Sequence, residues 1–134
     1  MKIYLRAAAL MLSILLLSCA LCSCASRYDE ALSGTWVITS FVTQDGTNAT
    51  IENELCIVFD GNGHGEMRTA SEAYYTFTYT ARRGSMLRVI DYGRGEPEVV
   101  EETYTIQPDG TLTIVTPETQ NAPAATIMFK RKGT

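Results

Sequence analysis

The chain has 134 residues, of which 46% are hydrophobic and 19% are charged, a composition typical of a single globular domain. This length excludes a multidomain enzyme, and the apolar content excludes a disordered tail. The formal net charge of −4 and the sequence pI near 4.9 exclude a basic nucleic-acid binder, so no nucleic-acid partner is expected.

Residues 1–24 carry the features of an export signal. Lys2 and Arg6 precede a mostly apolar run that is shorter than the about 20 residues of a membrane-spanning helix. The segment then ends in Leu-Cys-Ser-Cys at Cys24, which resembles the end of a bacterial lipoprotein signal peptide. The sequence therefore predicts cleavage before Cys24 and acylation of this residue.

The acylation site has an alternative. A similar Leu-Leu-Ser-Cys pattern ends at Cys19, and processing there leaves Cys22 and Cys24 in the mature chain. Cleavage before Cys24 removes Lys2 and Arg6, and the formal net charge of −4 becomes −6. An acidic body is not attracted to an anionic leaflet, so the acyl anchor is the expected membrane partner. This predicts a membrane-anchored lipoprotein of the cell envelope that faces outside the cytoplasm.

From Gly34 onward, short β-prone runs alternate with turn residues, and no window shows a helical period. The clearest run covers 75–80, where three aromatic residues alternate with threonines and so occupy opposite faces of a strand. The predicted strands are Gly34–Thr43, Glu54–Phe59, His64–Ala70, Tyr75–Thr80, Ser85–Tyr92, Glu98–Gln107, Thr111–Val115 and Ala125–Arg131. The run His64–Ala70 is polar, and we expect it at an edge or facing solvent.

Eight short strands joined mostly by short turns predict an all-β fold, an antiparallel up-and-down meander. Closure into a small barrel is the simplest way for such a sheet to hide its edges. The predicted barrel domain covers residues 34–132. Residues 25–33 form a tether before it, in which Ser26–Leu32 is a linker or one helical turn.

The residue types argue against a metal site and against catalysis. The single histidine, His64, lies in a glycine-rich turn, which excludes a His-clustered zinc site. Asp60, Asn62 and His64 superficially match a calcium loop, but Ser71 stands where a bidentate Glu is required. No G-x-S-x-G motif presents a nucleophile. No metal, cofactor or catalytic residue is therefore predicted, and we expect the protein not to be an enzyme.

An acidic cluster and one cysteine are given structural interpretations. Glu96, Glu98, Glu101 and Glu102 are expected to be solvated and not catalytic, because Glu98 and Glu102 share one side of a strand with Val100 while Glu101 points the opposite way. Cys56, inside an apolar run, is expected to be a buried strand thiol.

Aromatic residues are the remaining candidates for a site. They are Trp36, Phe59, Tyr75, Phe77, Tyr79, Tyr104 and Phe129. In a barrel of eight strands, such side chains either fill the core or line a pocket for a small hydrophobic ligand. Both interpretations remain open from the sequence.

Several short motifs resemble small bacterial lipocalin-like lipoproteins. The chain has the Gly-x-Trp opening at Trp36, a Phe-x-x-x-Gly-x-Gly hairpin from Phe59 to Gly65, and Tyr79-Thr80. It also has an Asp-Gly-Thr-Leu hairpin at Asp109 and ends in the Phe-Lys-Arg strand. The resemblance implies an eight-stranded lipocalin-like barrel in which Trp36 plugs one end.

Together, these features predict a monomeric, lipid-anchored, lipocalin-like protein that binds a small hydrophobic ligand or an envelope component without catalysis. The alternative is a structural or protein-interaction module of the envelope with a solid core.

Overall fold

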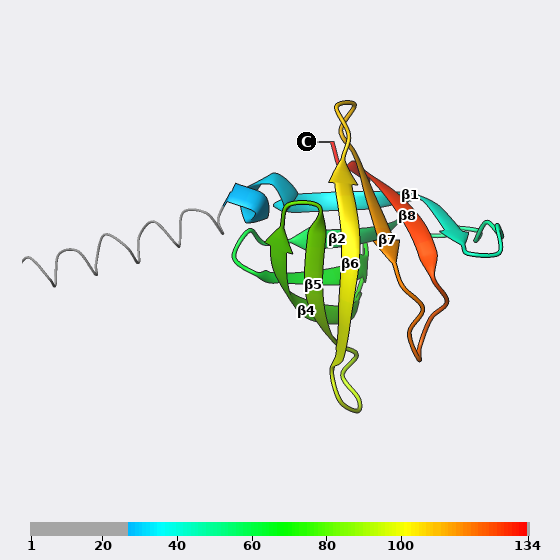
Figure 1. The fold of residues 1–134 in the computed structure, drawn as a ribbon. Coiled ribbons are helices and arrows are strands. Elements are labelled where there is room, and N and C mark those ends of the chain that lie inside the picture. Colours follow the sequence, from blue (N-terminus) through cyan, green and yellow to red (C-terminus); the bar gives the residue numbers. More distant parts are fainter. Residues whose placement is uncertain (1–26, 134) are drawn as a thin grey trace, which may run out of the picture.

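The computed structural model describes residues 27–133, and in this range the chain forms eight strands and a short helix over residues 27–32. The strands are β1 (Gly34–Thr43), β2 (Leu55–Phe59), β3 (His64–Thr69), β4 (Ala73–Arg82), β5 (Ser85–Asp91), β6 (Glu98–Ile106), β7 (Thr111–Thr116) and β8 (Ala125–Arg131). Each strand pairs antiparallel with the next, and β8 pairs with β1, so the sheet closes into an up-and-down barrel (Figure 1). The predicted fold class is confirmed. The signal segment and both candidate acylation sites, Cys19 and Cys24, lie outside the described residues.

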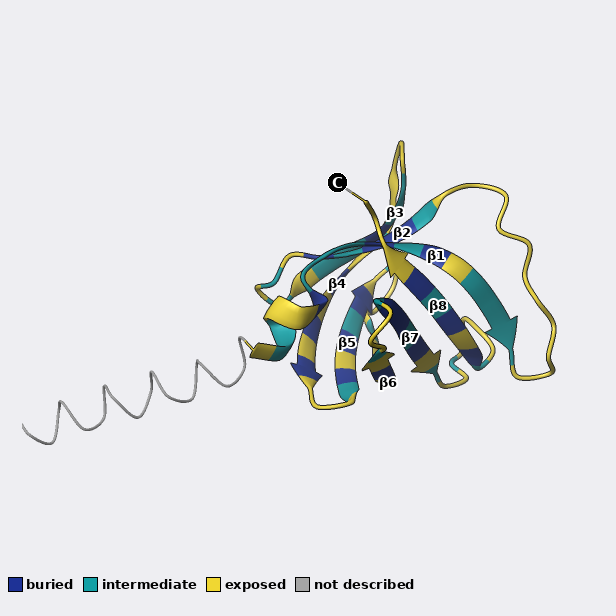
Figure 2. Ribbon diagram, turned by 90° about the horizontal axis from the view of Figure 1, so that it is seen from above, coloured by how far each residue is buried: buried dark blue, intermediate teal, exposed yellow. Residues whose placement is uncertain are grey.

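The barrel follows from the alternation of apolar and polar residues along each strand. In β4, Phe77 and Tyr79 are buried while Thr76, Thr78 and Thr80 are exposed, as the period of two predicts. The same alternation of buried and exposed residues is visible on most strands (Figure 2). Because every strand presents an apolar face, closure buries all of these faces against one another.

The helix over residues 27–32 covers one end of the barrel, which we call the closed end. Leu32 and Trp36 are fully buried there, and the Trp36 indole N–H donates to the Leu32 carbonyl at 2.8 Å. From β8, Arg131 stacks 4.2 Å from the Trp36 ring and donates to the carbonyls of Ala31 and Ser33 at 2.7 and 2.8 Å. These contacts fasten the helix to the first and last strands. In residues 27–133, no helix is long and apolar enough to cross a bilayer.

The third strand is not an edge strand, but, as the other predicted alternative has it, most of its residues are partly exposed and only Met67 is buried. β3 is not at an edge, because it pairs with β2 on one side and with β4 on the other. Its Met67 is buried between Ile57 and Tyr75. Closure supplies both partners, so even a polar strand is held in the wall and contributes one large side chain to the core.

The hairpin between β6 and β7 depends on an aspartate. The Asp109 carboxylate accepts a hydrogen bond from the Thr111 N–H at 2.9 Å, and Gly110 completes the turn at φ 88°. The hydrogen bonds from Thr111 lower the pKa of Asp109 from its ordinary value of 3.8. Because the pKa of Asp109 is lower in the folded protein than in the unfolded chain, its carboxylate stabilises the fold at pH values above the unfolded-state pKa. This stabilisation is lost as the pH falls through the folded-state pKa.

We expect Asp109→Asn to separate this effect from the geometry of the turn. At about pH 7 its urea midpoint should match that of the unmodified chain, because asparagine accepts the same backbone bond. Below about pH 4, the unmodified chain should lose more stability than the variant. Urea midpoints of both chains at about pH 7 and about pH 3 measure this. Equal losses in the two chains would contradict the prediction.

Candidate functional site

The two ends of the barrel differ. β1 runs away from the helix, so the loops 44–54, 70–72, 92–97 and 117–124 gather at the opposite end, which we call the open end. The closed end carries the shorter turns and the helix (Figures 1 and 2). A ligand that enters the barrel along its axis therefore enters at the open end.

All seven predicted aromatic residues belong to the interior. Six of them, all except Tyr75, are buried in one core cluster, and Tyr75 packs against it half-buried. The Phe59 ring lies 5.6 Å from the Phe77 ring and 5.0 Å from the Tyr79 ring, centre to centre, in edge-on contacts. The Tyr104 hydroxyl donates to the Arg82 carbonyl at 2.6 Å. The six buried aromatic side chains are therefore in contact with protein atoms, as expected of a packed core.

A buried ion pair lies inside the barrel. Arg88 on β5 and Glu102 on β6 are 5% and 1% exposed, and they form a fork in which Nε faces Oε1 and Nη2 donates to Oε2 at 2.9 Å. The guanidinium also lies 4.9 Å from the centre of the Phe77 ring. Burial by itself lowers the pKa of Arg88, but the hydrogen bonds and charge of Glu102 outweigh burial and raise it. Arg88 therefore keeps its positive charge in the interior, facing the Glu102 carboxylate.

The third nitrogen of this guanidinium is unsatisfied. Among residues 27–133, Arg88 Nη1 is buried and has no hydrogen-bond partner. On the open-end side, Tyr75 packs edge-on to Tyr92 with ring centres 5.3 Å apart. A buried donor without a partner costs about 1–3 kcal/mol. The arrangement offers this donor to an acceptor group of a ligand, or to water, beneath the open end.

An apolar pocket of about 320 Å³ lies at the open end, between β1, β2 and the loop that joins them. It is lined by Ile38, Phe41, Ala49, Thr50, Ile51, Glu52, Asn53, Leu55, Thr69 and Tyr74. Ile38 is buried, while Phe41 and Leu55 pack against the core and expose part of their surface to the pocket. Its size falls at the lower end of small-molecule sites, about 300–1,000 Å³.

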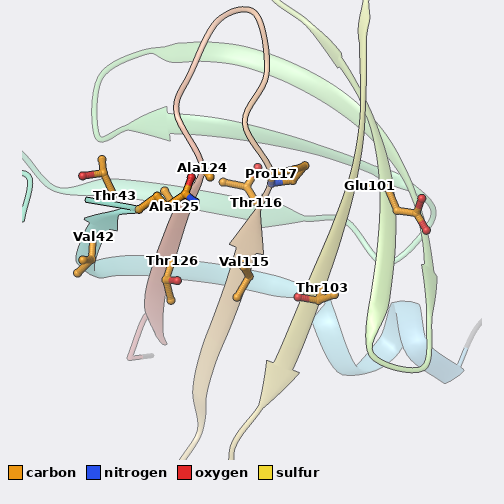
Figure 3. Close-up of a pocket in the computed structure, with 11 residues that line it drawn as sticks. Val42, Thr43, Glu101, Thr103, Val115, Thr116, Pro117, Ala124, Ala125 and Thr126 are labelled. Atoms are coloured by element: carbon orange, nitrogen blue, oxygen red, sulfur yellow. The ribbon is translucent and has the colours of Figure 1, made fainter. Parts of the chain in front are cut away.

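A second hollow lies on the wall of the barrel. It measures about 550 Å³ and is formed by β1, β8, the end of β7, the start of loop 117–124 and β6 (Figure 3). Val115 and Thr126 line it from the outer face, and Glu101 and Thr103 form its β6 side. A neighbouring groove of about 680 Å³ continues along β6 and loop 117–124.

No family model matches the chain. No curated protein matches it in sequence either. The barrel is therefore shown by the structure alone, and the resemblance to lipocalin-like lipoproteins stays a prediction.

Glu101 points away from the face of Glu98 and Glu102, as predicted, but the expectation that the acidic run is solvated is wrong for Glu102. Glu102 is buried with Val100 on the inner face and is paired with Arg88. Glu101 is exposed on the outer face, and Glu98 accepts a hydrogen bond from the Asn121 amide. The carboxylates therefore point to three different surroundings, which does not suit a paired acid and base.

The remaining candidates have structural environments. Asp60 accepts hydrogen bonds from the N–H groups of Asn62 and His64, at 2.7 and 3.0 Å, and so holds its turn. Across residues 27–133, no group of three or more His, Cys, Asp or Glu side chains gathers around a point where a metal ion fits. Cys56 is buried, its Sγ lies 3.7 Å from a Glu54 carboxylate oxygen, and burial raises the pKa of its thiol.

Proposed function

We propose that the protein is a lipid-anchored, extracytoplasmic binding protein with a lipocalin-like barrel, and that it holds a small hydrophobic molecule at its open end. The observation that carries this proposal is the asymmetry of the barrel. One end is sealed by Trp36 and the helix, whereas the other has an apolar pocket beside Phe41 and Leu55. We place the ligand there and not among the seven predicted aromatic residues, because most of these fill the core.

The chemistry of the interior narrows the ligand. Arg88 does not line this pocket, and Glu102 already neutralises it; a ligand that extends from the pocket into the interior would therefore meet the Nη1 donor with a neutral acceptor, such as a carbonyl or hydroxyl, and not with a second carboxylate. The preferred ligand is then mainly apolar with one neutral polar group. Its binding needs no bond to be made or broken, in keeping with a carrier and not an enzyme.

The distribution of charge supports an orientation for the anchored protein. Exposed basic residues outnumber exposed acidic residues at the closed end: Arg27, Arg82, Arg83, Lys130, Arg131 and Lys132 against Glu30, Asp60 and Asp109. Each loop of the open end carries an acidic residue, for example Glu52, Glu72, Glu96 and Glu118, and loop 92–97 also carries the exposed Arg94. Arg27 follows Cys24 by three residues, which span at most about 11 Å. An acyl chain on Cys24 then holds the basic, closed end toward the membrane and leaves the open end accessible.

The experiment that tests the binding site fills the pocket. In Ala49→Phe, a large side chain occupies the space between Phe41 and Leu55, so an apolar fluorescent probe, N-phenyl-1-naphthylamine, should bind at least about tenfold more weakly. The matched control is Ala122→Phe, which adds the same ring to the exposed loop 117–124. Fluorescence titration of the full chain in detergent micelles, with correction for the micelle signal, measures the affinity of both variants for the probe.

Two results oppose the proposal. If the probe is not bound above the micelle background, the open end is not a hydrophobic site. If Ala49→Phe and Ala122→Phe bind the probe equally well, the ligand does not occupy this pocket. Either result favours the alternative, an interaction module that acts through its outer surface.

A further inference from the structure

The wall of the barrel is incomplete between β6 and β7. The two strands pair only from Thr103↔Val115 to Ile106↔Leu112. Toward the open end, β6 continues to Glu98, and over residues 98–102 it pairs with β5 alone. Pro117 follows β7 directly, and proline has no N–H with which to extend the ladder. We call the resulting gap, between β6 residues 98–102 and loop residues 117–120, the β6 slot.

The direction of the free backbone groups follows from one hydrogen bond. The Tyr104 N–H donates to the Gly84 carbonyl at 3.1 Å, so even-numbered residues of β6 direct their backbone groups toward β5. Odd-numbered residues direct theirs the other way, and Thr103 uses them to pair with Val115. Within the described range 27–133, nothing pairs with the corresponding groups of Val99 and Glu101. The β6 slot therefore presents two N–H donors and two C=O acceptors in the spacing of a strand.

The space beside these groups is a groove. It measures about 680 Å³, and its two walls are 98–103 of β6 and 117–120 of the loop. Glu98 bonded to Asn121 bounds it at the open end, and the Thr103↔Val115 pair bounds it at the other. Figure 3 shows Glu101 standing apart from Thr116 and Pro117 on the facing segment, beyond the paired Thr103 and Val115.

The surface beside the slot combines two exposed valines with carboxylates. Val99, on the slot, and Val115, at the end where the pairing of β6 with β7 begins, are 63% and 46% exposed. Glu98, Glu101 and Glu118 line the groove, and among residues 27–133 none of them forms an ion pair. No lining residue of the groove is basic. A partner that fits must therefore combine backbone-like hydrogen bonding with positive charge.

We propose that the β6 slot binds an extended, basic peptide segment of another protein, which adds to β6 as a short strand. Its backbone pairs with Val99 and Glu101. Lysine or arginine side chains on its outer face lay their apolar stems over Val99 and Val115 and bring their charged groups to the Glu101 carboxylate, while the alternate, apolar side chains face inward. A polyamine matches the charge but has no carbonyl groups for the free N–H donors. This inference is independent of the hydrophobic pocket, because the two sites share no lining residue.

The test uses three fluorescein-labelled hexapeptides and the full chain in detergent micelles. The first peptide alternates lysine and valine, the second replaces lysine by glutamate, and the third repeats the first with alternate backbone nitrogens methylated. Fluorescence anisotropy should show saturable binding of the first peptide below about 1 mM. The methylated peptide keeps the charge but loses strand pairing, so its affinity should fall at least about tenfold. The glutamate peptide should not bind.

Variants of the chain locate the site. Glu101→Lys reverses a charge at the slot and should lower the affinity for the lysine–valine peptide about tenfold. Glu72→Lys makes the same change in an exposed loop at the open end and should leave the affinity unchanged. Amide hydrogen exchange followed by NMR should slow at Val99 and Glu101 when the peptide is bound.

The following results would overturn the proposal. Equal binding of the methylated peptide, or full competition by spermidine at equal charge concentration, would show attraction by charge alone. Equal weakening by Glu101→Lys and Glu72→Lys would place the peptide elsewhere. Unchanged exchange at Val99 and Glu101 in the saturated complex would exclude strand addition.

Discussion

Replacement of Glu102 by alanine is expected to lower the free energy of unfolding by about 3–5 kcal/mol. The change leaves the Arg88 guanidinium charged in the interior, where its side chain is only 6% exposed. Two further donors, Nε and Nη2, then join Nη1 without an acceptor. A loss of this size is a large part of the about 5–15 kcal/mol that stabilises a typical domain.

The double variant Arg88→Met with Glu102→Leu separates the cost of a broken pair from the value of the pair. Since it removes both charges and keeps the volume apolar, its stability should lie within about 1 kcal/mol of the unmodified chain or above it. Glu101→Ala, on the exposed face of the same strand, should change stability by less than about 0.5 kcal/mol. Urea unfolding followed by the fluorescence of Trp36, the single tryptophan, measures all three.

The outcomes are distinguishable even if Glu102→Ala does not fold. A double variant as unstable as the single one would show that the pair itself stabilises the barrel, contrary to this prediction. A single variant as stable as Glu101→Ala would show that water reaches Arg88 when its partner is absent. If the double variant folds, its affinity for the apolar probe also reports whether the Arg88 donor takes part in binding.

The barrel was predictable because its strands carry a local signal. Alternation with a period of two is present within single strands such as β4, and residues such as Asp109 and Gly110 mark the turns. The strand ends differ from prediction by one or two residues, since the partner strand decides where a ladder stops. β6, for example, ends at Ile106 and not at Gln107, whose N–H already belongs to the turn and donates to the Thr111 carbonyl.

The ion pair between Arg88 and Glu102 was not predicted, although the sequence contains part of the pattern that indicates it. Glu102 alternates with the apolar residues Val100 and Tyr104, which are buried on the same face of the strand. Arg88 similarly alternates with the buried Met86 and Ile90. A charge on each apolar face indicates a buried pair, but only the register of β5 against β6 shows that these two side chains meet.

The pocket and the β6 slot depend on relations between distant segments. Phe41 and Leu55 meet residues of loop 44–54, whose path no local pattern defines. The slot exists because β6 extends further toward the open end than its pairing with β7 does. Pro117 signals where β7 stops, whereas the length of β6 is set by its pairing with β5. No sequence motif therefore predicts that β6 extends beyond its pairing with β7.

Gly65 is required for space, and its replacement should be among the most damaging single changes. Gly65 on β3 faces the Phe77 ring, and a Cβ placed there would lie 2.6 Å from Phe77 Cε2 and also too close to the Val58 carbonyl oxygen. That oxygen belongs to β2, which is paired on both sides and cannot move independently. We therefore expect Gly65→Ala to cost about 3 kcal/mol or more.

The cause can be separated with two further variants. Phe77→Leu in the Gly65→Ala background should recover only part of the loss, because it relieves the ring contact but not the contact with the Val58 carbonyl. Gly63→Ala changes the neighbouring turn glycine, at φ 87°, and should cost about 1–2 kcal/mol through backbone strain alone. Its loss should not respond to Phe77→Leu, since the atom nearest to its added Cβ is the Tyr79 carbonyl oxygen. Urea midpoints and near-ultraviolet circular dichroism of the unmodified chain, Phe77→Leu, each glycine variant and each glycine variant combined with Phe77→Leu measure these differences. If Phe77→Leu restores all the stability lost in Gly65→Ala, the contact with the Phe77 ring alone explains why a glycine is required. If it restores none, the close approach of β2 to β3 explains it.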